Sequence, residues 1–151
     1  MLLSQLLTPQ RIRIPLAAGD KPAALRELVQ MVASDDLVAA AELLLAVEER
    51  EAVLSTGIGH GVAIPHGRSG RVTDVRVSAG VTTVPIEFGS LDGSPVRLFF
   101  LLVGPESEAG THVRALSRIS RLVRQPLVRE RLVQSGTSDE FYQRLREAEG
   151  A

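Results

Sequence analysis

The chain has 151 residues, of which 44% are hydrophobic, and this suits one globular domain over residues 1–151 with a sizeable core. It contains no cysteine, which excludes disulfides, thiolate metal sites and cysteine nucleophiles. The formal net charge is −1 and acids and bases are interleaved, so nothing in the charge pattern favours nucleic acid as a partner.

The first half of the chain predicts one strand and two helices. Residues 1–9 have no basic segment and reach a proline too early for a signal peptide or a membrane span, so we expect a cytoplasmic protein without membrane insertion. Residues 11–14 alternate polar and apolar before a proline, which is typical of a short strand at a sheet edge. Asp20 is a candidate N-cap for a helix with apolar residues at helical spacing, and residues 34–36 offer a cap for a second helix over residues 37–50.

The second half predicts two longer strands joined by a turn. Residues 75–82 alternate between apolar and polar or small side chains, as expected for a strand with one buried face. Residues 96–103 are almost all apolar, which fits a central strand covered on both faces. Residues 89–93, Gly-Ser-Leu-Asp-Gly, have the composition of a turn or short loop between them.

Helices are expected to follow. Thr111 is a candidate cap for a long helix, with His112 in its first turn and a proline at 126 that interrupts or restarts it. Residues 138–140 are expected to cap a last helix that runs to Arg146. The long helix has an apolar face of Val113, Leu116, Ile119, Leu122 and Val123, and an opposite face of Arg114, Arg118, Arg121 and Arg124. That arginine face is either solvated or a docking surface for an acidic partner.

These elements predict an α/β fold, a mixed β-sheet of about five strands flanked by helices on both faces.

The most informative segment is residues 55–67, Ser-Thr-Gly-Ile-Gly-His-Gly-Val-Ala-Ile-Pro-His-Gly. It holds two of the three histidines, His60 and His66, among four glycines. Pro65 fixes its own φ and biases Ile64 toward an extended backbone, so the His66 imidazole is expected on a short strand with little freedom. A histidine that is held in one orientation in this way indicates a residue that takes part in a reaction.

Several alternatives can be weighed from the residues alone. A dinucleotide-binding loop would need glycine or alanine where the chain has Val62, a P-loop would need lysine where it has Arg68, and no Gly-x-Ser-x-Gly frame exists for a serine hydrolase. A zinc hydrolase that uses His60, His66 and His112 stays open, provided that the glycines fold the segment back on itself. A tight turn that leads into a buried strand, without chemistry, also stays open.

The run Ile58-Gly59-x-x-Val62-Ala63-Ile64-Pro65-His66-Gly67, preceded by Glu51, resembles the active-site signature of enzyme IIA of the bacterial phosphotransferase system, fructose/mannitol type. The similarity extends over nearly the whole chain, through Arg50-Glu51 before Ser55-Thr56-Gly57 and Thr111-His112 in a later helix. The segments 99–103 and 138–142 look closest to the nitrogen-regulatory branch of this family.

The resemblance implies that an HPr-type phosphocarrier phosphorylates His66, and that the group then passes to a IIB domain or serves as a signal to a regulated protein target. Arg50 and His112 are expected to stabilise the transferred group, and Ser55, Thr56, Gly59 and Gly61 to supply further hydrogen-bond donors. No metal or other cofactor is expected, because the donor is a phosphohistidine rather than ATP.

Two points remain open. The regulatory role is favoured over sugar transport, because no IIB, IIC or HPr module is fused to the chain. Relatives often carry asparagine where this chain has His60, which could tune His66, compete for phosphate or replace an amide hydrogen bond. We favour the last and leave His60 out of the catalytic set.

Overall fold

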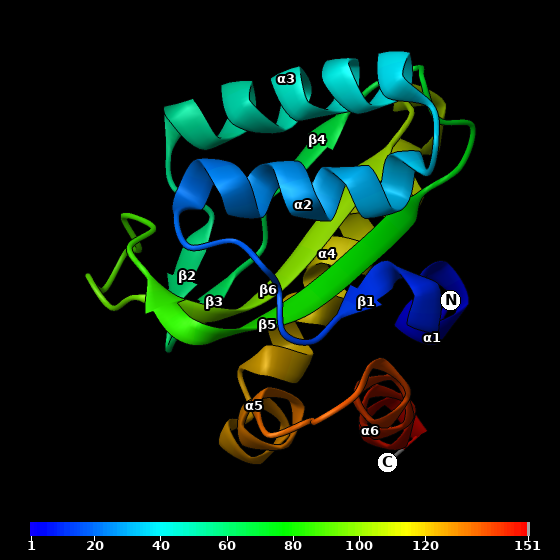
Figure 1. The fold of residues 1–151 in the computed structure, drawn as a ribbon. Helices are drawn as coiled ribbons and strands as arrows, with labels where there is room; N and C mark the ends of the chain where they lie inside the picture. Colours follow the sequence, from blue (N-terminus) through cyan, green and yellow to red (C-terminus); the bar gives the residue numbers. More distant parts are fainter. Residues whose placement is uncertain (151) are drawn as a thin grey trace.

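A computed structural model describes residues 1–150 and places a six-stranded mixed sheet between two groups of helices (Figure 1). The strand order is β1-β5-β6-β3-β2, and β4 also pairs with β6. The β5–β6 and β2–β3 pairs are antiparallel, whereas β1 runs parallel to β5 and both β3 and β4 run parallel to β6. The predicted α/β fold with helices on both faces is therefore confirmed, with six strands instead of about five.

The bounds of the elements differ from the expected ones by a few residues in most cases. In chain order they are α1 (Leu3–Leu6), the 3₁₀ turn η1 (Pro9–Arg11), β1 (Ile12–Arg13), α2 (Lys21–Ala33), α3 (Leu37–Val53), β2 (Gly57–Gly59), β3 (Val62–Ala63), β4 (His66–Arg68), β5 (Arg76–Ile86), β6 (Val96–Gly104), the 3₁₀ turn η2 (Glu106–Glu108), α4 (Ala109–Val123), α5 (Pro126–Val133) and α6 (Ser138–Gly150).

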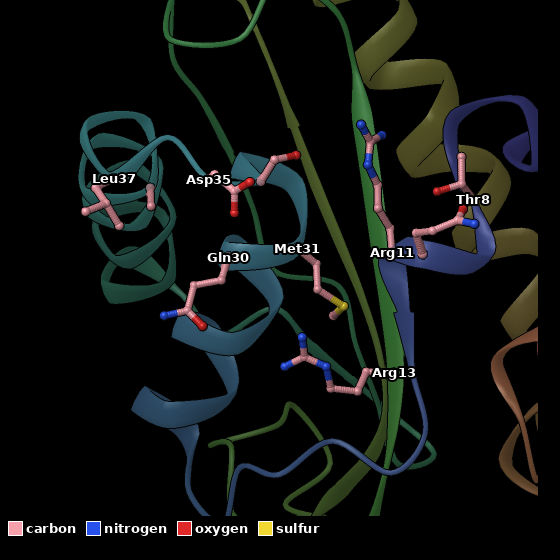
Figure 2. A pocket seen from close by; sticks show the side chains of 10 residues that line it. Thr8, Arg11, Arg13, Gln30, Met31, Asp35 and Leu37 are labelled. Carbon is pink, nitrogen blue, oxygen red and sulfur yellow. The ribbon is translucent and has the colours of Figure 1, made fainter.

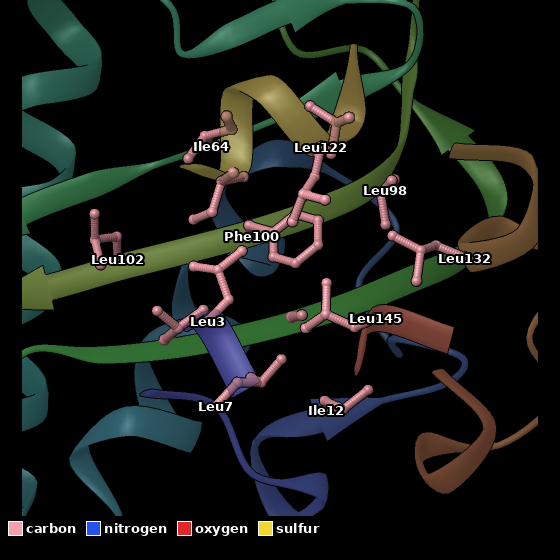
Figure 3. Packing of buried hydrophobic residues seen from close by; sticks show 14 of the residues in the cluster. Leu3, Leu7, Ile12, Ile64, Leu98, Phe100, Leu102, Leu122, Leu132 and Leu145 are labelled. Atoms are coloured by element: carbon pink, nitrogen blue, oxygen red, sulfur yellow. The ribbon is translucent and has the colours of Figure 1, made fainter. Parts of the chain in front are cut away.

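Strand β6 is the centre of the fold because its two faces belong to different hydrophobic clusters. Successive side chains of a strand point to opposite sides. Leu98, Phe100 and Leu102 pack with residues of α1, α4, α5 and α6 (Figure 3). Phe99 and Leu101 pack on the other side, beneath α2 and α3. The prediction of a central strand covered on both faces is thus confirmed.

Strand β5 is also buried on both sides over most of its length, so the prediction of one buried face is wrong. Ser78 and Gly80 are covered by α2 and by the segment that precedes it. Ser78 is fully buried and its hydroxyl donates to the Leu28 carbonyl at 2.9 Å. A Cβ on Gly80 would lie 2.5 Å from Cγ of Leu16, so this glycine makes room for a core side chain. The alternation with polar and small residues therefore reflects close packing of α2 and of the segment before it onto β5, and not exposure to solvent.

The helix caps were predicted correctly at the start of α2 and α3. Asp20 accepts a hydrogen bond from the Ala23 amide at 2.9 Å, and Asp36 accepts one from the Ala39 amide at 3.0 Å. The cap of α6 was misplaced by one residue, because Thr137 accepts from the Glu140 amide at 3.1 Å. Pro126 starts α5, so the long helix is interrupted there and a new one begins.

Helix α4 differs from the prediction in its start and in its buried face. It begins at Ala109, so Thr111 lies inside the first turn and does not cap it. The buried side contains His112, Ala115 and Ile119, whereas Val113 is 58% exposed and was wrongly assigned to the core face. Within residues 1–150, no helix combines the length and apolar character needed to cross a membrane.

Candidate functional site

The glycine-rich segment 55–67 forms a hairpin followed by a short strand. Strands β2 and β3 are joined by a two-residue loop, His60-Gly61, in which φ is +56° and +77°. Positive φ at both positions is the type I′ geometry, for which Asn-Gly is a favoured pair. His60 thus occupies a turn position, and its amide donates to the Asp92 carboxylate at 3.1 Å.

The short strand β4 then places His66 beside β6 and beneath α3. His66 pairs in register with Leu102. A Cβ on Gly67 would lie 3.0 Å from the carbonyl carbon of Ala46 and from the Val47 nitrogen, so the absent side chain lets α3 approach β4 closely. Arg50 is four residues after Ala46 and lies on the same helix face. Gly67 therefore brings the end of α3 to His66.

His66, His112 and Arg50 meet at one surface depression of about 550 Å³. The rings of His66 and His112 are 5.8 Å apart between centroids, with an angle of 65° between their planes. The three predicted residues come from β4, α4 and α3, which are well separated in the sequence. The lining consists of Ala46, Glu49, Arg50, His66, Gly67, Arg68, Glu106, His112, Val113 and Leu116.

The hydrogen bond of His66 identifies its free ring nitrogen. Nδ1 lies 2.9 Å from the Ile64 carbonyl oxygen. A carbonyl can only accept, so Nδ1 carries the proton of the neutral ring and Nε2 keeps its lone pair. Burial lowers the pKa of His66, and the positive charges of Arg50 and Arg68 lower it further, against the hydrogen bond to Ile64 and the charge of Glu51. The ring is therefore neutral at pH 7.

His112 is a buried, neutral donor. It is 3% exposed, and burial together with the charge of Arg68 lowers its pKa to about 4. Its Nδ1 atom has no hydrogen-bond partner among residues 1–150. A neutral imidazole offers one N–H and one acceptor nitrogen, so His112 can donate a single hydrogen bond toward a group bound in the depression.

Two arginines supply the positive charge. Arg50 is partly exposed and its Nη1 donates to the Leu54 carbonyl at 2.8 Å, at the end of its own helix. Arg68 forms an ion pair with Glu106 at 3.2 Å. Arg68 is not among the site residues predicted from the sequence. Its spacing from His66 could have identified it, because residues i and i+2 of a strand share a face and Arg68 is two residues after His66.

The structure does not bring the other predicted phosphate-binding residues to this depression. The Ser55 hydroxyl donates to the Phe88 carbonyl at 3.0 Å, and the Thr56 hydroxyl donates to the Glu51 carboxylate. Gly59 packs against the Asp92 carboxylate, and the Gly61 carbonyl accepts from β6 amides. These four residues instead stabilise the β2–β3 hairpin and the segment that precedes it.

The trihistidine zinc alternative is wrong. Val62 pairs with Leu98 and His66 with Leu102, so the two rungs are separated by four residues of β6, about 13 Å. His60 lies beyond Val62, at the far end of the hairpin. Within residues 1–150, no three His, Cys, Asp or Glu side chains are grouped so that they could bind a metal ion.

A buried ion pair supports the backbone around His66. Glu51 is 7% exposed and forms an ion pair with Lys21 at 2.9 Å. Its carboxylate also accepts a hydrogen bond from the Thr56 amide at 2.9 Å. The Thr56 carbonyl in turn accepts from the Ile64 amide at 3.0 Å, and the Ile64 carbonyl holds the His66 ring. Glu51 is thus linked to His66 through two backbone residues.

Comparisons with known proteins show which family this chain resembles. Residues 5–148 match the family model described as phosphoenolpyruvate-dependent sugar phosphotransferase system, EIIA 2. A nitrogen regulatory protein of Bradyrhizobium diazoefficiens is 35% identical over 145 residues, which cover 94% of this chain and 93% of that protein. A fructose-specific EIIABC component of Bacillus subtilis is 32% identical over 143 residues, covering 92% of this chain and 22% of that protein. The crystal structure of nitrogen regulatory protein IIA-Ntr from Neisseria meningitidis aligns with a TM-score of 0.88 at 30% identity, over 95% of this chain and 98% of that one.

Proposed function

Because this chain belongs to the EIIA 2 family of the phosphoenolpyruvate-dependent sugar phosphotransferase system, we propose that it carries a phosphoryl group on Nε2 of His66. The observation that supports this most directly is the hydrogen bond from Nδ1 to the Ile64 carbonyl at 2.9 Å. It leaves Nε2 as the nucleophile, in a depression that also contains two arginines and a buried histidine.

The transfer balances without a cofactor. The Nε2 lone pair attacks the phosphorus of a phosphohistidine on an HPr-type donor, the new N–P bond forms, and the donor's N–P bond breaks to leave a neutral imidazole. The group then leaves Nε2 by the same kind of step. Because the pKa of His66 is lowered by burial, the neutral nucleophile is the main form at pH 7.

The surrounding residues stabilise the charge on the phosphoryl oxygens. Phosphoryl transfer depends mainly on alignment and on positive charge around those oxygens. Arg50 supplies a planar guanidinium from α3, and His112 supplies one N–H from α4. Arg68 breaks its ion pair with Glu106 and binds the incoming phosphoryl group instead, because that group carries more negative charge than one carboxylate.

We place the protein in the regulatory branch, where its phosphorylation state controls binding to a protein target in the cytoplasm. The nitrogen regulatory protein of Bradyrhizobium diazoefficiens is matched over 93% of its length, and IIA-Ntr of Neisseria meningitidis has nearly the same fold. The sugar-transport alternative is that the group passes to a cysteine of a IIB domain.

Labelling tests the chemistry. Phosphoenolpyruvate carrying ³²P, enzyme I and HPr should label the wild-type protein with one acid-labile, base-stable phosphate. His66→Ala should lose the label entirely, whereas His60→Ala, a matched histidine outside the depression, should retain it. Acid-labile phosphate on His66→Ala would overturn the proposal.

A second assay separates the two roles. Labelled protein is mixed with purified fructose- and mannitol-type IIB domains. Transfer within seconds would identify a transport component, and a stable label would support the regulator.

A further inference from the structure

A second and larger depression lies away from His66, between the sheet edge and the α2–α3 corner (Figure 2). Its volume is about 790 Å³, and none of its residues lines the first depression. One wall comes from η1 and β1, and the other from the end of α2 and the start of α3. The lining residues are Thr8, Gln10, Arg11, Arg13, Gln30, Met31, Ser34, Asp35, Leu37 and Ala40.

Arg11, on the first wall, is a cation that forms no ion pair within residues 1–150. Arg13 beside it is paired with Glu27 at 2.9 Å, and the Glu27 carboxylate also accepts from the amides of Ala17 and Ala18. The neighbouring Arg76 is paired with Asp74 at 3.1 Å. The Arg11 side chain forms no hydrogen bond or ion pair with any residue in the range 1–150, although it is only partly exposed. Burial, and then the charge of Arg76, lower the pKa of Arg11, and the charge of Asp74 offsets this only in part, so the protein solvates this guanidinium poorly.

The opposite wall carries an anion, Asp35, that also forms no ion pair within residues 1–150. Asp35 lies in the α2–α3 corner, is exposed, and makes no side-chain hydrogen bond or ion pair within the described residues. Figure 2 shows Asp35 and Arg11 on the two sides of the depression, which are formed by different segments of the chain. Gln30 and Thr8 offer neutral donors and acceptors, and Met31 gives an apolar contact.

A ligand that satisfies both walls has a carboxylate for Arg11 and an ammonium group for Asp35. A guanidinium binds a carboxylate through two parallel hydrogen bonds, so arginine is better suited to this contact than lysine. Asp35 would repel a dianion such as phosphate, and Arg11 would repel a simple cation. Pockets that combine an apolar contact with a few convergent polar groups are typical of small-molecule sites.

We propose that this depression binds a small zwitterion of the α-amino acid class, with its carboxylate on Arg11 and its ammonium group on Asp35.

The test uses NMR on the full chain. Each of the twenty L-amino acids is added separately to ¹⁵N-labelled protein at constant ionic strength, and the arginine Nε–H and backbone signals are followed. We expect saturable shifts at Arg11 and at the α2–α3 corner for at least one amino acid. The analogue without its amino group and the analogue without its carboxylate should each bind about tenfold more weakly, since each loses one charged hydrogen-bonding contact.

Variants locate the site. Arg11→Gln and Asp35→Asn should each weaken the binding about tenfold. Arg26→Gln is the matched control, because Arg26 is exposed on α2 and does not line the depression, and its affinity should stay within twofold of wild type. Circular dichroism verifies that all three variants fold.

Three outcomes would overturn the proposal. One is the absence of saturable shifts with all twenty amino acids. A second is equal binding of the analogue without an amino group and no effect of Asp35→Asn, which would indicate a simple anion site. A third is equal weakening by Arg11→Gln and Arg26→Gln, which would indicate attraction by surface charge alone.

Discussion

Replacing Glu51 by glutamine removes one charge from the buried contact that supports His66. The glutamine side chain has nearly the same shape and keeps an oxygen that can accept from the Thr56 amide. The negative charge opposite Lys21 is lost, although the remaining oxygen can still accept from the Lys21 ammonium, which also keeps the Phe88 carbonyl at 2.9 Å and the Phe88 ring, 4.3 Å from its centroid. The amide group that replaces the second carboxylate oxygen can no longer accept from the Thr56 hydroxyl.

The expected loss of stability follows from the burial of the pair. Removal of one partner from a buried ion pair destabilises proteins by about 3–5 kcal/mol. The Lys21 side chain is still 29% exposed, so water solvates it in part, and we expect about 2–3 kcal/mol. For a domain of this size, that corresponds to a decrease in Tm of roughly 4–12 °C.

The loss should depend on pH in a defined direction. Burial alone would raise the pKa of Glu51, but the hydrogen bonds from Thr56 and Lys21 outweigh it, so the pKa in the folded protein is lowered. A lowered carboxyl pKa contributes stability that is fully present above the ordinary value, about 4.5, and is lost as the pH falls through the folded-state value. The difference between wild type and Glu51→Gln should therefore be largest near pH 7 and shrink below about pH 4.5.

Thermal unfolding by circular dichroism between pH 7 and pH 3.5 measures this difference. Glu48→Gln is the control, since Glu48 lies on the same helix but is exposed. A second measurement is the pKa of His66 by NMR, which should decrease in Glu51→Gln because the charge of Glu51 raises it in the wild type. Equal Tm values for the two variants at pH 7, or a difference that stays constant down to pH 3.5, would refute the reasoning.

Three further predictions concern the glycine-rich segment. Gly67→Ala should destabilise the protein by about 1–3 kcal/mol in urea unfolding, because the new Cβ would lie 3.0 Å from the backbone of Ala46, while Gly70→Ala, with no atom within 4 Å, should not. The rate of phosphoryl uptake by His66 should stay level from pH 8 to about 6.5 and fall only below that, since its pKa is lowered by burial; a decline that starts above pH 6.5 would contradict this. His60→Asn should raise the free energy of unfolding by up to about 1 kcal/mol, because asparagine tolerates the left-handed backbone of this turn, and should leave ³²P labelling unchanged; loss of the label would give His60 a direct role.

The sequence predicted well wherever a single local rule decides the outcome. The apolar run of β6 predicted a central strand, and the aspartates before α2 and α3 predicted their caps. The errors arise where tertiary packing decides. Nothing local in the sequence around Ser78 shows that α2 covers it, and helix α4 begins two residues before the threonine that would be its natural cap.

The candidate site shows the same division. His66, the nucleophile that we propose, lies in a local motif and could be named from the sequence, whereas its neighbours in the depression depend on how β4 pairs. Arg68 lies in the same depression as His66 because β4 is a strand, in which the side chains at i and i+2 share one face. Conversely, Thr56 has the hydroxyl expected for phosphate binding, but the fold uses it to hold Glu51.

The topology explains why the site lies at this edge of the sheet. Strands β4 and β6 are parallel, so both end at the same edge, and Arg68 pairs in register with Gly104, the last residue of β6. The chain then turns through η2 into α4, which brings His112 back over the strand end. Ligands of open α/β folds bind at such carboxyl ends of strands. Of the four glycines in residues 55–67, only Gly67 helps to bring the site residues together, because it lets α3 approach β4. The other three glycines shape the hairpin on the far side. Backbone packing, more than direct contact with a ligand, therefore accounts for the glycines around His66.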